Sequence, residues 1–203
     1  MNSVKYDGAD ISPSKIICIG RNYVEHIKEL DNEIPSEPVV FIKPNSAISN
    51  NLETSNDDEI HYEGEICFII RNCKISGIGF GLDLTKRNVQ KVLKTKGLPW
   101  ERAKAFDKSA VFSEFVNCDE DLSHYRMELF IDNKLQQFGN YELMINKPEA
   151  LLSEIQSFLT MEDGDIIMTG TPKGVGVIRS GELFPAKIYN DEQLIVEHSW
   201  LAR

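Results

Sequence analysis

The segment from residue 61 to residue 70 constrains the fold most strongly, because it begins with polar and charged side chains and ends in an apolar run. That run, Ile66 to Ile70, is far too short to span a bilayer. A short apolar run bounded by polar residues is typical of a strand whose inner end is buried. We therefore predict a strand over residues 61–70, polar at its start and apolar at its end.

Two glutamates at the start of this strand predict a metal site. Glu63 and Glu65 are two residues apart, so their side chains share a face, which continues through apolar Cys67 and Ile69. Like charges at the edge of a buried face repel and lose hydration unless a positive charge lies between them. Mg²⁺ fits, because it binds carboxylate oxygens and keeps water positions for substrate. Asp83 is the best third ligand, because it lies at the junction between a second predicted strand and the helix that follows it.

The pattern alone leaves alternatives open. Glu63 and Glu65 could face solvent, and Asp83 could simply be a residue at the start of a helix. His61 could also bind the metal, and a site with histidine would favour Mn²⁺, Fe²⁺ or Zn²⁺. The four cysteines show no CxxC spacing, which predicts neither a zinc site nor a disulfide framework.

The remaining patterns predict a single β-rich α+β domain over residues 1–203, with 41% apolar residues to supply its core. Further strands are expected over residues 15–20, 39–43, 78–84 and 166–168, and hairpins over 127–138 and 186–197. Helices are expected over residues 21–30, 85–96 and 148–159. Thr85 is the expected N-cap of the second helix, with Val89, Val92 and Leu93 as its apolar stripe. Residues 31–38 and 45–58 are expected to be loops, the second an exposed excursion.

Charge and composition exclude several classes of partner. The net charge of −10 argues against a nucleic acid, which usually needs a basic face. The N-terminus carries no signal-peptide pattern, and no apolar run is long enough for a membrane span. Residues 169–176 are Gly-rich but lack the spacing of a phosphate-binding loop. We expect a cytoplasmic protein without a membrane or nucleic-acid partner.

Several motifs in order resemble the fumarylacetoacetate hydrolase family. They occupy nearly the whole chain, from about residue 15 onward: GRNY with His26 and Glu29 after it, HYEGE, GFGLDLTKR, KAFD and TGTPKGVG, at residues 20–29, 61–65, 79–87, 104–107 and 169–176. The segments GLPW and AK, at residues 97–100 and 103–104, are similar to the short acylpyruvase and oxaloacetate decarboxylase branch.

The resemblance implies a β-rich mixed roll or sandwich with a few flanking helices, usually as a homodimer. It implies Mg²⁺ or Mn²⁺ and a small 2-oxo acid that chelates the metal through its carboxylate and keto oxygens. The implied residues are Glu63, Glu65 and Asp83 as metal ligands, His26, Glu29 and Lys104 as catalytic groups, and Arg21, Gln90 and Thr171 around the substrate.

Departures from the family pattern put the substrate in doubt but remove no ligand. The connection between Glu65 and Asp83 is short, Arg87-Asn88 stands where Arg-Asp is frequent, and Gly64 stands where a bulkier residue is usual.

The implied chemistry passes through an enolate of the 2-oxo acid held at the metal. His26 and Glu29 share a helical face and could activate water, although such a pair is also common on helix surfaces. Lys104 could donate a proton, with a pKa lowered by a nearby divalent cation, or could simply be solvated. Arg21 could pair with a distal carboxylate of the substrate or anchor a loop.

The predicted function is acylpyruvate C–C hydrolysis or oxaloacetate decarboxylation. The alternative is an isomerase or tautomerase acting on 2-hydroxy-dienoates or on oxaloacetate. A third possibility is a protein that binds metal and keto acid without catalysis.

Overall fold

The computed structural model describes residues 1–55 and 58–203. Its elements in chain order are β1 (Val4–Tyr6), β2 (Ala9–Ile11), β3 (Lys15–Gly20), α1 (Val24–Glu29), β4 (Val39–Pro44), the 3-10 helix η1 (Asn45–Ala47), β5 (Ile48–Ser49), β6 (Ile60–Tyr62), β7 (Gly64–Arg71), β8 (Lys74–Asp83), β9 (Thr85–Lys86), α2 (Arg87–Thr95), α3 (Glu101–Lys104), β10 (Ala110–Phe112), β11 (Val116–Asn117), β12 (Tyr125–Ile131), β13 (Lys134–Asn140), α4 (Pro148–Phe158), β14 (Ile166–Met168), β15 (Gly176–Val177), β16 (Leu183–Asn190) and β17 (Gln193–Leu201).

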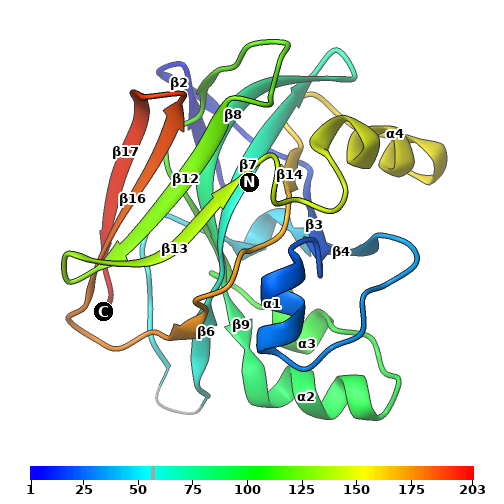
Figure 1. The fold of residues 1–203 in the computed structure, drawn as a ribbon, viewed down its shortest axis with the longest axis vertical. Helices are drawn as coiled ribbons and strands as arrows, with labels where there is room; N and C mark the ends of the chain where they lie inside the picture. The colour runs from blue at the N-terminus through cyan, green and yellow to red at the C-terminus, as the bar shows by residue number, and fades with distance from the viewer. Residues whose placement is uncertain (56–57) are drawn as a thin grey trace.

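A mixed central sheet carries the strands that position the site. Its order is β4-β3-β14-β7-β8-β10-β5, with β11 paired to β8. The β3–β14 and β10–β5 pairs are parallel and the other pairs are antiparallel. A second sheet, β13-β12-β16-β17, stands beside the strongly curled β7 and β8 (Figure 1).

The core explains why the strands of the two sheets differ in pattern. β7 is buried from Gly64 to Ile70, because Phe68 packs toward the second sheet while Cys67 and Ile69 join a separate apolar cluster. β12 instead alternates buried and half-buried residues, since only one of its faces packs on the core. The fold is therefore β-rich and layered around β7 and β8, in agreement with the predicted class.

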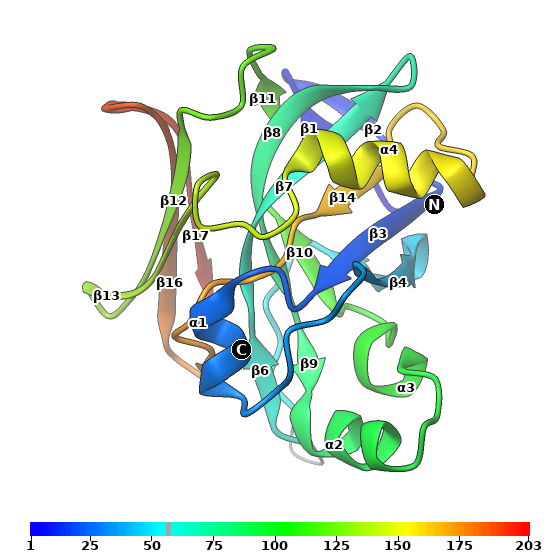
Figure 2. The same cartoon turned by 45° about the vertical axis from the view of Figure 1, so that its right-hand side comes forward.

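Helices cover the remaining surface of the central sheet. The buried side chains of α4, among them Leu151 and Ile155, pack on residues of β3 and β14 such as Ile17 and Ile167. The shorter helices α1, α2 and α3 gather beside one end of the central sheet (Figure 2). Pro148 begins α4 at a first helical position, as predicted.

Several predicted boundaries are wrong. Strand 61–70 is two strands, β6 and β7, broken at Glu63, and strand 78–84 begins earlier, at Lys74. The helix expected over 21–30 is limited to Val24–Glu29. The expected excursion 45–58 contains η1 and β5 and buries Ala47, Ile48 and Leu52, while its residues 56–57 lie outside the described part of the chain.

Thr85 is not an N-cap, which corrects another prediction. It belongs to β9, and α2 begins at Arg87 with Lys86 in the cap position. The Thr85 hydroxyl accepts a hydrogen bond from Lys104 Nζ at 2.7 Å instead, so a tertiary contact has replaced the local one. The buried residues of α2 are Gln90 and Leu93, whereas Val92 is 51% exposed.

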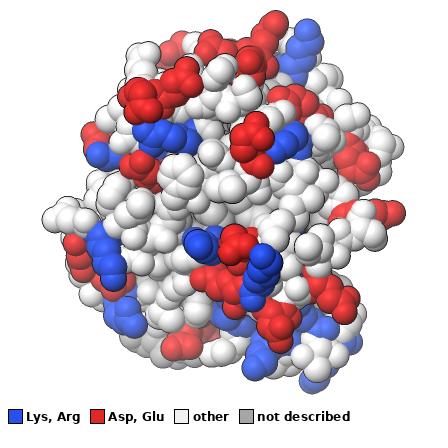
Figure 3. Space-filling model, viewed as in Figure 1, with Lys and Arg blue, Asp and Glu red and all other residues white. Residues whose placement is uncertain are grey.

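Charged residues of both signs cover the surface. On the face shown in Figure 3, lysines and arginines are interspersed with aspartates and glutamates. Within the described residues, no helix has the length and apolarity that a membrane span requires.

Candidate metal and substrate site

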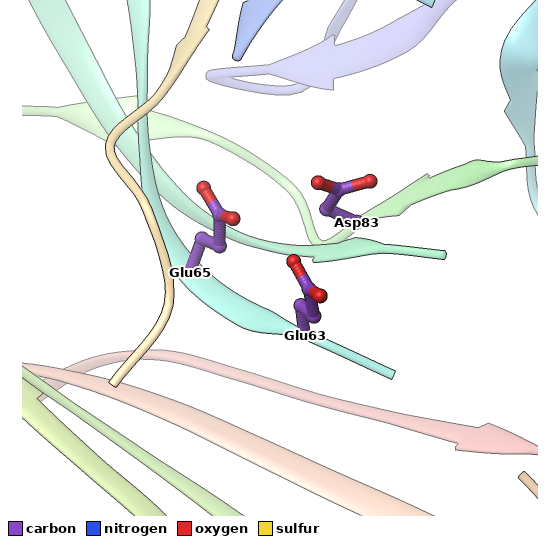
Figure 4. A group of neighbouring side chains, drawn as sticks. All are labelled: Glu63, Glu65 and Asp83. Atoms are coloured by element: carbon purple, nitrogen blue, oxygen red, sulfur yellow. The ribbon is translucent and has the colours of Figure 1, made fainter. Parts of the chain in front are cut away.

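Antiparallel pairing of β7 and β8 brings the predicted carboxylates together. Glu65 lies opposite Gly81, and the backbone N–H of Asp83 donates to the carbonyl of Glu63 at 2.8 Å. One oxygen each of Glu63, Glu65 and Asp83 lies within 4.8 Å of the others, the only such group of potential ligands found in the described residues. Figure 4 shows the side chains directed toward a common space. Glu65 and Asp83 stand on paired strands, and Glu63, directly before β7, is joined to Asp83 through its carbonyl, so backbone pairing fixes the spacing of all three.

The electrostatics of Glu65 favour a cation at this point. Its side chain is 1% exposed, and its Oε2 accepts a hydrogen bond from the N–H of Gly170 at 2.7 Å. Burial, and then repulsion by Asp83 and Glu63, raise the pKa of Glu65 well above its usual value. The protein's own groups therefore leave negative charge at Glu65 uncompensated. A hard divalent cation fits this donor set, since it would favour the ionised form of all the carboxylates.

Gly170 is the residue that allows this contact. Its φ of +97° lies in the left-handed region, and an added Cβ would come within 2.8 Å of Asn22. A glycine is therefore required where the chain turns after β14 to aim its N–H at Glu65.

Lys104 lies directly against the carboxylates. Its Nζ donates to Glu63 Oε2 at 2.9 Å and to Asp83 Oδ2 at 2.7 Å, and the side chain is 3% exposed. Burial acts to lower the pKa of Lys104, but Asp83 and Glu63 outweigh it and raise the pKa above its usual range. The lowered pKa predicted for Lys104 beside a bound divalent cation stays a prediction. The protein's own groups hold Lys104 as an ammonium ion.

Lys43 and Arg87 complete the charge balance around the carboxylates. Lys43 Nζ lies 2.8 Å from Asp83 Oδ1, and Arg87 forms an ion pair with Glu63 and donates to Gln90 Oε1 at 2.8 Å. Burial acts to raise the pKa of Glu63, but Lys104 and Arg87 outweigh it, so its pKa lies well below the usual value. Glu63 therefore remains ionised, in contrast to Glu65.

The predicted His26–Glu29 pair is present on α1. His26 Nδ1 lies 3.1 Å from Glu29 Oε2, and His26 is 6% exposed. Oε1 of Glu29 accepts a hydrogen bond from the backbone N–H of Gly174 at 3.0 Å. This bond joins α1 to the segment that follows β14. Because a carboxylate only accepts, the Nδ1 of His26 carries a proton and Nε2 is the basic nitrogen.

One pocket, partly open to solvent, gathers most of the predicted site. The predicted residues that line it are Arg21, His26, Glu63, Asp83, Gln90, Lys104 and Thr171. The remaining two do not line it, since Glu29 lies behind His26 and Glu65 lies against Gly170.

The structure also places His61, the alternative metal ligand, and Thr171, the implied substrate contact. His61 is not part of the carboxylate group, and it pairs in β6 with Thr85 and Val177 instead. The Thr171 hydroxyl donates to the carbonyl of Gly64 at 2.9 Å and accepts from Gln137 Nε2 at 2.9 Å. Thr171 lines the pocket, but within the protein its hydroxyl is already engaged.

Gly64 is explained by the same neighbourhood. A Cβ at this position would lie 2.9 Å from both Gln137 Oε1 and Phe80 Cζ. The backbone N–H of Gly64 also donates to Gln137 Oε1 at 2.8 Å. Gly64, which stands where the family usually has a bulkier residue, leaves the space that the side chain of Gln137 occupies.

Sequence reasoning missed several residues of the site: Asn32, Phe41, Lys43, Arg87, Lys94 and Trp100. Lys43 gave no usable signal, because it stands at the end of the predicted strand over residues 39–43, directly before Pro44. Lys94 gave no signal, since it stands among other lysines of a polar helix.

Comparisons with known proteins identify one family over most of the chain. The family described as fumarylacetoacetate (FAA) hydrolase, C-terminal, matches residues 15–198. The oxaloacetate tautomerase YcgM of Escherichia coli is 37% identical over 191 residues, 85% of this chain and 87% of the relative. The mitochondrial oxaloacetate decarboxylase of Dictyostelium discoideum is 37% identical over 195 residues, 86% of this chain and 88% of the relative.

A solved structure is similar over almost the whole chain. It is the fumarylpyruvate hydrolase of Pseudomonas aeruginosa in complex with Mn²⁺ and pyruvate, with a TM-score of 0.88 and 27% identity over 99% of this chain and 95% of that chain.

Proposed function

The chain belongs to the fumarylacetoacetate hydrolase family, and from this premise we propose that it is a divalent-cation-dependent enzyme that moves a proton at C3 of oxaloacetate. Its family and its β-rich fold class are those predicted from the sequence. The observation that carries the proposal is the buried group Glu63, Glu65 and Asp83, which lies against Lys104 in the pocket that His26 also lines.

The carboxylates would hold the cation, which supplies Lewis-acid polarisation of a keto oxygen when bound. Their fixed positions on β7 and β8 orient the 2-oxo acid relative to the pocket walls. Support for a cation comes from the raised pKa of Glu65 and from the Mn²⁺ bound to the similar fumarylpyruvate hydrolase. We propose Mg²⁺ as the physiological ion, with Mn²⁺ as an active substitute.

Lys104 and His26 are proposed to handle the proton and the developing charge. The Lys104 ammonium lines the same pocket as Glu63 and Asp83, and we propose that its positive charge stabilises negative charge on the substrate. Its three N–H donors bind Glu63, Asp83 and Thr85 within the protein, so this role rests on charge and not on a direct hydrogen bond. His26 is oriented by Glu29, which leaves Nε2 to take a proton from C3. Arg21, Gln90 and Thr171 line the pocket and are proposed to position the substrate.

Hydrolysis of acylpyruvates is the second candidate, and the His26–Glu29 pair favours it. A paired imidazole is suited to activating water for attack on a distal carbonyl, a step that tautomerisation does not need. The fumarylpyruvate hydrolase structure supports this candidate, while the tautomerase and decarboxylase relatives support the first.

A substrate panel tests the proposal. Oxaloacetate, acetylpyruvate, fumarylpyruvate and a hydroxymuconate analogue are assayed with Mg²⁺ and with Mn²⁺, before and after chelation with EDTA. We expect turnover of oxaloacetate that EDTA abolishes and added Mg²⁺ restores. Undiminished activity in EDTA would contradict the proposal, as would activity on none of these acids.

Further features expected from the sequence are retained as proposals. We propose one catalytic domain over residues 1–203, a homodimer and a cytoplasmic location. Sizing chromatography with light scattering tests the dimer, and fractionation of cells tests the location.

A further inference from the structure

The wall of the pocket formed by Lys94, Asn32 and Arg21 carries positive charge that the proposed chemistry does not use. Lys94 Nζ donates to Asn32 Oδ1 at 2.6 Å, and no carboxylate of the described residues forms an ion pair with it. An ammonium group has three donors, so further donors of Lys94 remain for a ligand.

Arg21 adds a second cation to this wall. Its backbone has a φ of +58°, uncommon for a residue with a side chain, at the turn between β3 and α1. Within the described chain, its guanidinium has no hydrogen-bond or ion-pair partner, although the side chain lines the pocket. A guanidinium that is free on a pocket wall is suited to binding a planar anion such as a carboxylate.

The charges near Lys94 are unbalanced as a result. Burial, and then the positive charges of Arg21 and Arg87, lower the pKa of Lys94. Of these cations, Arg87 is neutralised by Glu63, whereas Lys94 and Arg21 line the same pocket with no carboxylate of the described residues paired to either. A bound anion would relieve this repulsion.

We propose that Lys94, together with Asn32 and Arg21, forms the subsite for a carboxylate at the distal end of the substrate. The inference rests on the proposed function, in which the carboxylate group of β7 and β8 binds the 2-oxo acid end. It assigns the substrate class as 2-oxo acids with a second carboxylate, in preference to acylpyruvates with a neutral distal end. Lys94 is then a specificity-determining residue.

A purely structural role for Lys94 predicts a different outcome. The contact with Asn32 joins α2 to the segment that follows α1, so it could act only to hold that segment in place. Loss of such a contact would weaken binding of every ligand of the pocket alike. Loss of a carboxylate subsite would weaken only ligands with a distal charge.

Binding of unreactive 2-hydroxy acids separates these roles without any turnover. Malate and 2-hydroxybutyrate both chelate through a carboxylate and a hydroxyl, but only malate has a distal carboxylate. Calorimetric titration of the Mn²⁺-loaded protein is expected to show malate binding about tenfold tighter or more. In Lys94→Met the two affinities are expected to agree within about twofold, with 2-hydroxybutyrate unchanged. Equal affinities in the wild type, or an equal loss for both ligands in the variant, would overturn the inference.

Turnover measurements distinguish failure of the subsite from failure of the proposed function. Lys94→Met is expected to raise KM for oxaloacetate about tenfold and to leave acetylpyruvate kinetics unchanged. A wild type that turns over neither acid but prefers malate would reject the proposed function and keep the subsite. Lys91→Met is the matched control, because Lys91 is exposed on the same helix and does not line the pocket. Its affinities for both 2-hydroxy acids are expected to equal those of the wild type.

Discussion

Lys43 Nζ lies 2.8 Å from Asp83 Oδ1 in the interior of the protein, where neither side chain is more than 1% exposed. Lys43 also donates to the backbone carbonyls of Leu84, at 3.3 Å, and Lys104. A lysine on β4 thus joins the end of β8 to α3. The contact pairs the buried carboxylate of Asp83 with a cation of the protein itself.

Replacing Lys43 with methionine should strongly destabilise the fold. It leaves Asp83 buried with Lys104 as its remaining ion pair, and breaking a buried pair costs about 3 kcal/mol or more. Urea unfolding followed by circular dichroism measures this loss. Lys5→Met is the control, since the Lys5–Asp10 pair is 55% and 63% exposed, and there the loss should be below about 1 kcal/mol. An equal loss in the free energy of unfolding for both substitutions would show that the buried Lys43–Asp83 pair is no more important than an exposed pair.

Replacing Glu65 with glutamine should remove the response to metal and spare the metal-free protein. Its pKa is raised well above the usual value by burial, Asp83 and Glu63, so a neutral amide resembles its protonated state. Thermal melts with and without Mn²⁺ test this. The wild type should gain about 2.7 kcal/mol at a hundredfold excess over the dissociation constant. If Mn²⁺ raises the melting temperature of Glu65→Gln as much as that of the wild type, Glu65 is not a ligand. Glu53→Gln is the control, because Glu53 forms a surface ion pair with Lys108.

Replacing His26 with alanine should slow oxaloacetate enolisation, because Nε2 of His26 is the proposed base at C3, and should also slow acetylpyruvate cleavage where the same nitrogen activates water. Loss of a general base typically lowers kcat by about 10²- to 10⁴-fold, and Glu29→Gln should act in the same direction because it disturbs the orientation of the imidazole. The measurement is kcat for acetylpyruvate cleavage beside the rate of oxaloacetate enolisation. Full hydrolytic activity in His26→Ala would show that the pair does not activate water. Oxaloacetate enolisation at the wild-type rate in His26→Ala would show that His26 is not the base at C3.

The ionised side chain of Asp165 should stabilise the folded protein at neutral pH, and this stabilisation should be lost in acid. Burial acts to raise its pKa, but hydrogen bonds from Lys15, Ser14 and Glu162 outweigh it, so the pKa is lowered. A carboxyl whose pKa is lower in the folded state stabilises the fold above its unfolded pKa of about 3.9, and this contribution is lost as the pH falls through the folded pKa.

The free energy of unfolding as a function of pH tests this role of Asp165. The difference between wild type and Asp165→Asn should be largest at neutral pH and shrink below about pH 4. Asp10→Asn is the control, because Asp10 is 63% exposed. A difference for Asp165→Asn that is constant down to the acid limit would contradict the prediction.

The regular elements of the fold could be predicted where the local pattern and the tertiary packing agree. The hairpin of β12 and β13 turns at Asp132-Asn133, as its alternation predicts, and both residues have positive φ. Thr85 shows the opposite case, because its hydroxyl suits an N-cap but is bound by Lys104 from another element. Such a contact joins distant parts of the chain and leaves no local trace.

Strand and helix periodicity gave Glu63 with Glu65, and His26 with Glu29, a shared face but left exposed alternatives open. The family resemblance implied their roles, together with that of Asp83. Lys43 and Lys94 could not be given a role, because a lysine's partner depends on which strands and helices are neighbours. Lys43 meets Asp83 only because β4 and β8 converge near α3, and Lys94 reaches Asn32 only because α2 lies beside the segment after α1.

The break at Glu63 and the pairing of Glu65 with Gly81 anchor the ligand group to β7 and β8. His26, Arg21 and Lys94 stand instead on α1, a turn and α2, outside the sheet. Substitutions there can alter which bond reacts, or which acid is accepted, while the sheet retains its ligand geometry. Under the proposed roles, the residues that select the acid could change while the strands that would hold the metal keep their pairing.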